Sequence, residues 1–184
     1  VMEELKQLDM AGARLHVSIA DRPLGPSGAD EISFLLSANA GEELRPLSKV
    51  ASGGELARIM LAMKSVLSEG DQVETLIFDE VDSGVSGRAA QKLAQKLSDL
   101  SKKKQVLCVT HLAQIAAMAD THFLIEKSEN DGRTRTRVEA LDEASRAQEL
   151  ARLTGGAVIT DTTLLNAREL IASARAYKNG RGQL

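Results

Sequence analysis

Two acidic residues, Asp79 and Glu80, directly follow the run TLIF at residues 75–78. This run is apolar or β-branched without alternation, which is typical of a strand buried on both faces of a parallel sheet. Carboxylates at the end of a core strand are costly unless they meet a cation or a polar ligand. In nucleotide hydrolases one such acid supports Mg²⁺ and the other prepares a water for attack on a phosphate. The simpler alternative is a strand end that turns into solvent.

A histidine follows the next predicted strand, QVLCVT at residues 105–110. Ligands of open parallel sheets bind outside the carboxyl ends of the strands, so His111 and Glu80 are expected near the same edge. A histidine there can donate a hydrogen bond to a phosphate oxygen. The alternative is a structural histidine, which is our interpretation of His16 and His122 because both lie within strand patterns.

The third candidate is the stretch SGGE, residues 52–55, at the start of a predicted helix. Ser52 and Glu55 have the spacing of a capping box. Gly53 and Gly54 are unexpected in the first turn, because glycine costs about 1 kcal/mol against alanine in a helix. A helix N-terminus attracts anions, and glycines there would let a phosphate approach the backbone. The alternative is a plain cap with incidental glycines.

These residues need a framework of alternating strands and helices. We predict a helix end over 1–12 and two strands, 14–20 and 31–37, around a loop at 21–30. Both strands alternate apolar with other residues, which predicts one buried face. The next helix has Leu56, Ile59, Met60, Met63 and Leu67 on its packed stripe. The next elements are the strand 75–78, a helix packed through Ala90, Leu93, Leu97 and Leu100, and the strand 105–110. A short helix over 112–119 leads to strands over 122–127 and 133–141, which flank the hairpin signal ENDG. Helices over 143–153 and 162–177 follow.

The alternation of strand and helix in the middle of the chain predicts an α/β fold with a parallel sheet. Strands with antiparallel patterns at both ends predict a mixed, mainly parallel sheet flanked by helices.

Composition sets further bounds. The chain has 184 residues, 43% of them hydrophobic, and a net charge of −3, so the bulk charge gives no case for nucleic-acid binding. Cys108 is the only cysteine and lies in an apolar run, where we expect a buried small hydrophobe in a reducing cytoplasm. No apolar stretch approaches the length of a membrane span, and no signal peptide is visible. The chain begins with Val1 in what we expect to be mid-helix, and we interpret it as a fragment.

The order of the three motifs resembles that of the ATP-binding-cassette ATPases. SGGE looks like their signature motif, TLIFDE like their Walker B strand, and His111 like their switch histidine. The stretches LSKVASGGELARIMLAMK, FDEVDSGVSG and VTHLAQIAAMADTHFLIEK closely resemble RecN, a bacterial DNA-repair family of the SMC-like class, and FLLSANAGEELRPL also resembles it. The resemblance covers nearly the whole chain and implies the C-terminal lobe of an ATPase head.

The resemblance implies a role for each motif residue. The signature residues Ser52, Gly53 and Gly54 would contact the γ-phosphate of ATP held by the opposite head, and Glu55 would belong to the same ATP-binding signature. Asp79 would support Mg²⁺, through water, and Glu80 would be the general base. His111 would contact the γ-phosphate within its own head. The D-loop would comprise Asp82, Ser83, Gly84 and Ser86. Many relatives have an acid where this chain has Ser86, which leaves the D-loop contacts open.

One motif of such ATPases is absent, because no G-x-x-x-x-G-K-[ST] loop occurs in the 184 residues. The resemblance places that Walker A loop in an N-terminal lobe, beyond a long coiled coil. Residues 1–12 would then be the end of the returning coiled-coil helix, 13–178 the C-terminal lobe, and 179–184 a flexible tail. ATPase activity would require the Walker A lobe and a second head. The incomplete sheet should leave an apolar edge exposed, with poor solubility or self-association.

Partners and alternatives remain open at this stage. Arg133, Arg135 and Arg137 share a strand face, and Arg168, Arg175, Lys178 and Arg181 enrich the C-terminal region, but we interpret both sets as solvated surface. DNA would be engaged by the full assembly, in the bacterial cytoplasm and on the nucleoid, with no membrane. The alternatives are the head of another SMC-like chromosome-organising ATPase, a non-catalytic nucleotide-responsive module, and an unrelated phosphate binder.

Overall fold

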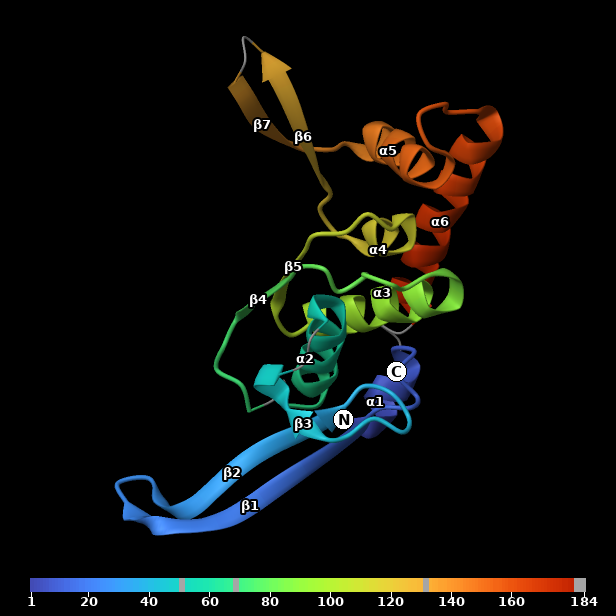
Figure 1. Cartoon of the computed structure of the whole chain (residues 1–184). Helices are drawn as coiled ribbons and strands as arrows, with labels where there is room; N and C mark the ends of the chain where they lie inside the picture. Colours follow the sequence, from blue (N-terminus) through green and yellow to red (C-terminus); the bar gives the residue numbers. More distant parts are fainter. Residues whose placement is uncertain (50–51, 68–69, 131–132, 181–184) are drawn as a thin grey trace. The chain divides into compact units, whose positions relative to one another are not determined.

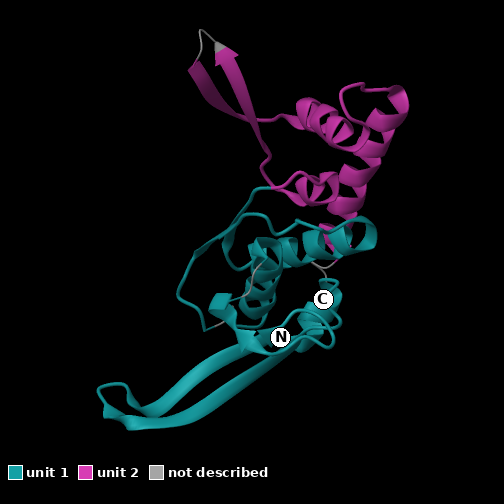
Figure 2. Cartoon of the chain, in the orientation of Figure 1, with its two compact units in different colours: residues 1–109 teal, residues 110–184 magenta. Residues whose placement is uncertain are grey.

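The computed structural model of the chain describes residues 1–49, 52–67, 70–130 and 133–180. It divides into two compact units, residues 1–109 and 110–184 (Figure 2). The lobe predicted over 13–178 therefore comprises residues of both units. In the described part, no helix is both long and apolar enough to cross a membrane.

The first unit combines helices with two small sheets. In chain order its elements are α1 (Met2–Gln7), β1 (Arg14–Gly25), β2 (Gly28–Ser37), β3 (Arg45–Pro46), the 3₁₀ turn η1 (Leu47–Lys49), α2 (Gly53–Leu67), β4 (Thr75–Phe78), α3 (Gly87–Ser101) and β5 (Gln105–Cys108). β1, β2 and β3 form an antiparallel sheet, whereas β4 and β5 pair in parallel. The α/β class and the parallel pair are confirmed, but the antiparallel strands form separate sheets rather than extending the parallel one.

A long ribbon is formed by β1 and β2 (Figure 1). The loop predicted over 21–30 is wrong, because β1 continues to Gly25 and β2 begins at Gly28. The register shifts between Asp21 and Gly25, an irregularity of the kind at which strands tolerate proline, here Pro23. Gly28 has φ +95°, which suits the tight turn. The glycines and prolines therefore serve a bulge and a short turn.

The apolar face of this ribbon is exposed along most of its length. The alternation predicted a buried face, and cross-strand pairs do align Val17 with Phe34 and Ile19 with Ile32. All four side chains are at least 42% exposed, whereas Leu36, at the base of the ribbon, is buried. The predicted pattern is confirmed, whereas its burial is wrong in this chain because the described elements of the first unit cover only the base.

The parallel pair β4–β5 is covered on one face. Leu76 and Phe78 point into the core, whereas Ile77 is 74% exposed and its neighbours Leu107 and Val109 are about half exposed. The prediction of a strand buried on both faces is therefore wrong in this chain. The exposed apolar surface agrees with the prediction that the sheet is incomplete.

The core of the first unit lies among α1, α2 and α3. Its fully buried side chains include Leu5, Leu8, Ile59, Leu61 and Leu93. The packed face predicted for α3 is confirmed, because Ala90, Leu93, Leu97 and Leu100 are all buried. The stripe predicted for α2 is partly wrong. Ile59 is buried, but Leu61 and Ala62 are buried beside it and Leu67 is exposed, because helices on two sides contact α2.

The second unit contains a helical core and a hairpin. Its elements are α4 (Ala113–Met118), β6 (Phe123–Asn130), β7 (Arg133–Ala140), α5 (Glu143–Gly155) and α6 (Asp161–Gly180). Small side chains of α4, α5 and α6 pack around Leu150 and Ile171. The antiparallel register from Phe123↔Ala140 to Asn130↔Arg133 confirms the predicted hairpin, although its turn residues 131–132 lie outside the described residues.

The predicted tail, residues 179–184, starts inside a helix. α6 includes Asn179 and Gly180, and residues 181–184 lie outside the described residues.

Arg146 of α5 fixes the end of α4, because its Nη2 donates hydrogen bonds to the carbonyls of Ala116, Ala117 and Ala119 at 2.6–3.1 Å. These bonds satisfy carbonyls that a helix end leaves without partners.

Candidate functional site

The start of α2 has the cap that the sequence predicts. The Ser52 hydroxyl accepts a hydrogen bond from the Glu55 backbone N–H at 3.4 Å, and the Ser52 carbonyl accepts from Leu56 at 3.0 Å. The side-chain bond is long, so the cap is weak in this chain. Because α2 begins at Gly53, the positive end of its macrodipole lies at Gly53 and Gly54.

The turn after β4 is tightly organised. Asp79 Oδ1 accepts from the Glu80 N–H at 2.9 Å, and the Ser83 N–H donates to the Glu80 carbonyl at 3.0 Å. Glu80 has φ +57°, a left-handed conformation that is uncommon for a residue with a side chain. Both carboxylates are exposed, so the burial cost that the sequence suggested does not arise in this chain.

The D-loop candidates continue this turn. Val81 and Asp82 are buried, at 0% and 3% exposure, and anchor it to the core. Gly84 has φ +71°, which suits glycine. Ser86 is the N-cap of α3, and its carbonyl accepts from the second turn of that helix, from Ala90, at 3.3 Å. The D-loop segment is therefore a structured connection between β4 and α3.

The two glycines of α2 lie against this turn. A Cβ on Gly53 would overlap Glu80 Oε2. A Cβ on Gly54 would lie 2.8 Å from Ser83 Cβ and 3.0 Å from the Glu80 carbonyl oxygen. The sequence interpretation assigned the glycines to a ligand, whereas the structure gives them a role within the chain: they let α2 approach the turn that carries Glu80.

A third contact joins α2 to the turn. Arg58 Nη1 donates to the Ser83 carbonyl at 2.7 Å and approaches the Val81 carbonyl at 3.4 Å. Burial is the main effect that lowers the pKa of Arg58, while Glu55 and Asp9 favour its charge. Sequence reasoning missed Arg58. The available signal was a single arginine in the apolar run LARIMLAM.

Burial and nearby carboxylates raise the pKa of the Cys108 thiol. Burial raises the pKa of its thiol to about 12, and the carboxylates of Asp82 and Asp79 raise it further. Cys108 is the register partner of Phe78, the last residue of β4. The sequence predicted a buried cysteine, and the structure shows a half-buried one with an unreactive thiol.

A groove of about 340 Å³ brings parts of two motifs together. It is lined by α2 residues from Gly53 to Lys64 and by β4 residues from Leu76 to Phe78, with Asp79 at the strand end. Signature and Walker B candidates therefore border one cavity of the first unit. Among the described residues, no three His, Cys, Asp or Glu side chains gather closely enough to hold a metal ion by themselves.

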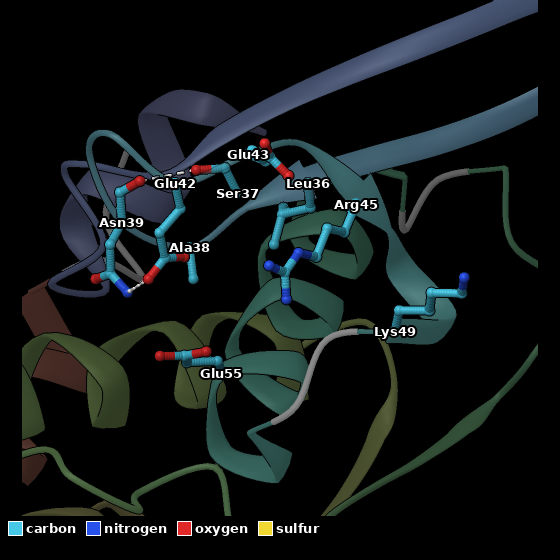
Figure 3. Close-up of a pocket in the computed structure, with 9 residues that line it drawn as sticks. All are labelled: Leu36, Ser37, Ala38, Asn39, Glu42, Glu43, Arg45, Lys49 and Glu55. Carbon is cyan, nitrogen blue, oxygen red and sulfur yellow. Dashed lines mark hydrogen bonds between the residues drawn. The ribbon is translucent and has the colours of Figure 1, made fainter.

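A second hollow, of about 330 Å³, lies beside the start of α2 (Figure 3). Arg45 and Lys49 are its basic residues, and Glu42, Glu43 and Glu55 are its acidic residues. Asn39 Nδ2 donates to Glu42 Oε1 at 2.8 Å and so holds one of these acids. The excess of negative charge disfavours a phosphate ligand in this hollow.

The switch-histidine candidate belongs to the second unit, whereas the other candidates belong to the first. His111 is exposed and precedes α4. The adjacent Thr110 hydroxyl accepts from the Leu112 N–H at 3.0 Å, which fixes the entry to the helix. His122, interpreted as structural, is half-buried, and burial lowers its pKa.

The basic residues support a solvated surface. The β7 arginines are exposed, and Arg137 pairs with Glu139 at 2.7 Å. On α6, Arg175 pairs with Glu143 at 3.1 Å and Lys178 with Asp120 at 2.6 Å. Arg168 is exposed, and Arg181 lies outside the described residues. Because several of these charges are paired with acids, they give no case for a nucleic-acid site.

Comparison with known structures concerns the fold. The Smc head domain of Pyrococcus yayanosii, with a coiled coil and joint, matches 83% of this chain and 28% of its own at a TM-score of 0.58 and 23% identity. The Smc head domain of Pyrococcus furiosus bound to the C-terminal domain of ScpA matches 82% of this chain and 36% of its own at a TM-score of 0.52 and 24% identity. These likenesses show an SMC-head type of fold.

Sequence relatives are closer. No family model matches the chain. The DNA repair protein RecN of Treponema pallidum is 46% identical over 183 residues, covering 96% of this chain and 32% of that protein. RecN of Bacillus subtilis is 52% identical over 155 residues, covering 84% of this chain and 27% of that protein. The chain is therefore homologous, over nearly its whole length, to RecN DNA repair proteins and corresponds to about a third of their length.

Proposed function

We propose that the chain is the C-terminal lobe of a RecN-type ATPase head, with its signature, Walker B, D-loop and switch-histidine elements acting in DNA double-strand-break repair. The observation that carries the proposal is the contact between the α2 start and the turn of Glu80. It gathers an anion-attracting helix end, a carboxylate and a strand-end acid in one part of the first unit.

Each group has a role in this proposal. The free N–H groups at Gly53 and Gly54, with the Ser52 hydroxyl, bind the γ-phosphate of ATP held by a second head. Glu80 orients and deprotonates the attacking water, a role that its exposed carboxylate just beyond the end of β4 supports. Asp82 to Ser86 form the D-loop at the contact between heads, and His111 donates to the γ-phosphate within its own head.

Mg²⁺ fits this arrangement as a shared ion. It keeps several waters and takes one or two carboxylates plus substrate phosphates, rather than a cage of protein ligands. Asp79 offers one such carboxylate, and the described residues contain no cluster that would hold the ion alone. Mg²⁺ bound with ATP would neutralise charge on the phosphates. The residues present therefore fit Mg–ATP only when a Walker A lobe supplies the phosphate cradle.

The exposed apolar surfaces support this need for a second lobe. Ile77, Leu107 and Val109 on the parallel pair, and the apolar face of the β1–β2 ribbon, are surfaces that a folded head would cover. In the proposed assembly, ATP clamps two heads together and hydrolysis releases them, while DNA is engaged by the complete protein.

Calorimetry with Mg–ATP tests the proposal, using this chain and the chain joined to a Walker A lobe. Glu80→Gln is included in both forms to suppress turnover. We expect no detectable binding by the chain alone, and binding without hydrolysis by the joined Glu80→Gln form. Stoichiometric micromolar binding by the chain alone would contradict the role of the glycines in contacting the opposite head's ATP.

A further inference from the structure

The turn of Glu80 is strained and therefore needs support. A non-glycine residue in the left-handed region is strained and persists only where its surroundings fix it. Glu80 has φ +57°, and its own turn supplies two hydrogen bonds, from its N–H to Asp79 Oδ1 and from the Ser83 N–H to its carbonyl. Gly54 closes the turn from the side of α2 by steric contact.

Arg58 of α2 also contacts this turn, through hydrogen bonds. Its Nη1 donates to the Ser83 carbonyl at 2.7 Å and approaches the Val81 carbonyl at 3.4 Å. These two carbonyls belong to the residues on either side of Asp82, just beyond Glu80. One guanidinium therefore holds both ends of the short segment 81–83 against α2.

The chemistry of this contact favours a purpose beyond packing. The guanidinium is half-buried, both its acceptors are neutral carbonyls, and its Nε is buried without a hydrogen-bond partner among the described residues. Burying a charge without a directly bonded carboxylate is costly. Both contacts come from Nη1 of a planar guanidinium, whose N–H directions are fixed, whereas a lysine ammonium turns freely on a flexible stem.

We infer that Arg58 is a positioning residue for Glu80. By holding the carbonyls of Val81 and Ser83, it maintains the left-handed turn that presents the Glu80 carboxylate at the start of α2. In the proposed dimer, α2 contacts the ATP of the opposite head. Through Arg58, the same helix sets the position of Glu80, which acts on the ATP of its own head. This inference rests on the proposed function, in which Glu80 is the general base.

The test uses the full head, with this chain joined to its Walker A lobe, and compares wild type with Arg58→Ala, Arg58→Lys and Lys96→Ala. Lys96 is a matched control, because its Nζ makes a largely buried ion pair with Glu4 Oε2, at a distance of 2.5 Å. Neither residue belongs to the turn. For Arg58→Ala we expect kcat to fall about 10- to 100-fold through misplacement of the base, with KM for ATP nearly unchanged. Arg58→Lys should recover part of kcat, because a lysine can still donate a hydrogen bond to the Ser83 carbonyl. Lys96→Ala should lower Tm and leave kcat unchanged.

Hydrogen exchange tests the same inference without turnover. The Ser83 N–H, bonded to the Glu80 carbonyl, should exchange faster in both Arg58 variants and unchanged in Lys96→Ala. If Arg58→Ala does not fold, Arg58→Lys supplies both readouts. Wild-type kcat and unchanged Ser83 exchange in a folded Arg58 variant would overturn the inference and leave the proposed function standing. An inactive wild-type head would overturn the proposed function, while Ser83 exchange would still decide whether Arg58 holds the turn.

Discussion

Replacing Gly53 and Gly54 by alanine, one at a time, separates two consequences of the same close contact. A Cβ at residue 54 would meet Ser83 Cβ at 2.8 Å, the Glu80 carbonyl oxygen at 3.0 Å and the Ser83 carbonyl oxygen at 3.2 Å. Two of these atoms are backbone oxygens and the third is a Cβ, in a turn anchored by the buried Val81 and Asp82, so they cannot move without distorting the site. A Cβ at residue 53 would overlap only the end of the exposed Glu80 side chain, which can rotate away.

The expected magnitudes differ in sign and in kind. Helix propensity alone would make either alanine more stable by up to about 1 kcal/mol. Overpacking at residue 54 costs about 1–3 kcal/mol, so Gly54→Ala should lower the free energy of unfolding by about 1–2 kcal/mol. Gly53→Ala should change it by less than about 0.5 kcal/mol. By moving the Glu80 carboxylate about 1 Å, Gly53→Ala should nevertheless lower kcat about 100-fold.

Urea unfolding followed by circular dichroism measures the first effect in this chain, and ATP turnover by the joined head measures the second. Gly180→Ala, at the end of α6, is the control for adding a Cβ without a clash, because a Cβ there meets no described atom within 4 Å. A Gly54→Ala chain as stable as Gly180→Ala, or normal turnover in Gly53→Ala, would refute the reasoning.

Four further outcomes are expected. Glu80→Gly should be more stable than Glu80→Ala by about 1 kcal/mol, in urea unfolding, because only glycine avoids strain at φ +57°. Cys108, with its thiol pKa raised to about 12, should react with iodoacetamide at pH 8 on the order of 1,000-fold more slowly than in unfolded chain. Burial lowers the pKa of His122, so its contribution to stability is present above the unfolded value of 6.5 and is lost as the pH falls below it. Thermal melts of His122→Gln should accordingly depend less on pH in that range. Arg146→Ala should lower the free energy of unfolding of the second unit by about 2–3 kcal/mol, measured by hydrogen exchange, through the lost bonds at the end of α4.

Local patterns predicted the elements that border the candidate site. The stripe on α3 and the hairpin over β6 and β7 depend on periodicity and turn residues close in sequence, and the strand at 75–78 on a continuous apolar or β-branched run. These signals are strong because each element buries or exposes its residues at a fixed period. The start of α2 at Gly53 and the strand end at Asp79 were predictable for the same reason.

Contacts between distant segments were not predictable in this way. Nothing in the run LARIMLAM indicates that Arg58 bonds to carbonyls of the turn after β4. The close approach of Gly53 to Glu80 likewise depends on how α2 crosses the end of β4. Burial of the β1–β2 ribbon was mispredicted because alternation identifies an apolar face but not what covers it.

The contact of Gly53 with Glu80 makes these two positions a single unit of sequence change. A lineage that gains a side chain at residue 53 must lose length at residue 80, or abandon the position of its carboxylate. Either substitution arising first passes through an impaired intermediate, so the two changes should be inherited together. An alignment of related sequences should therefore show covariation between positions 53 and 80, although the rest of α2 and β4 lie between them in sequence.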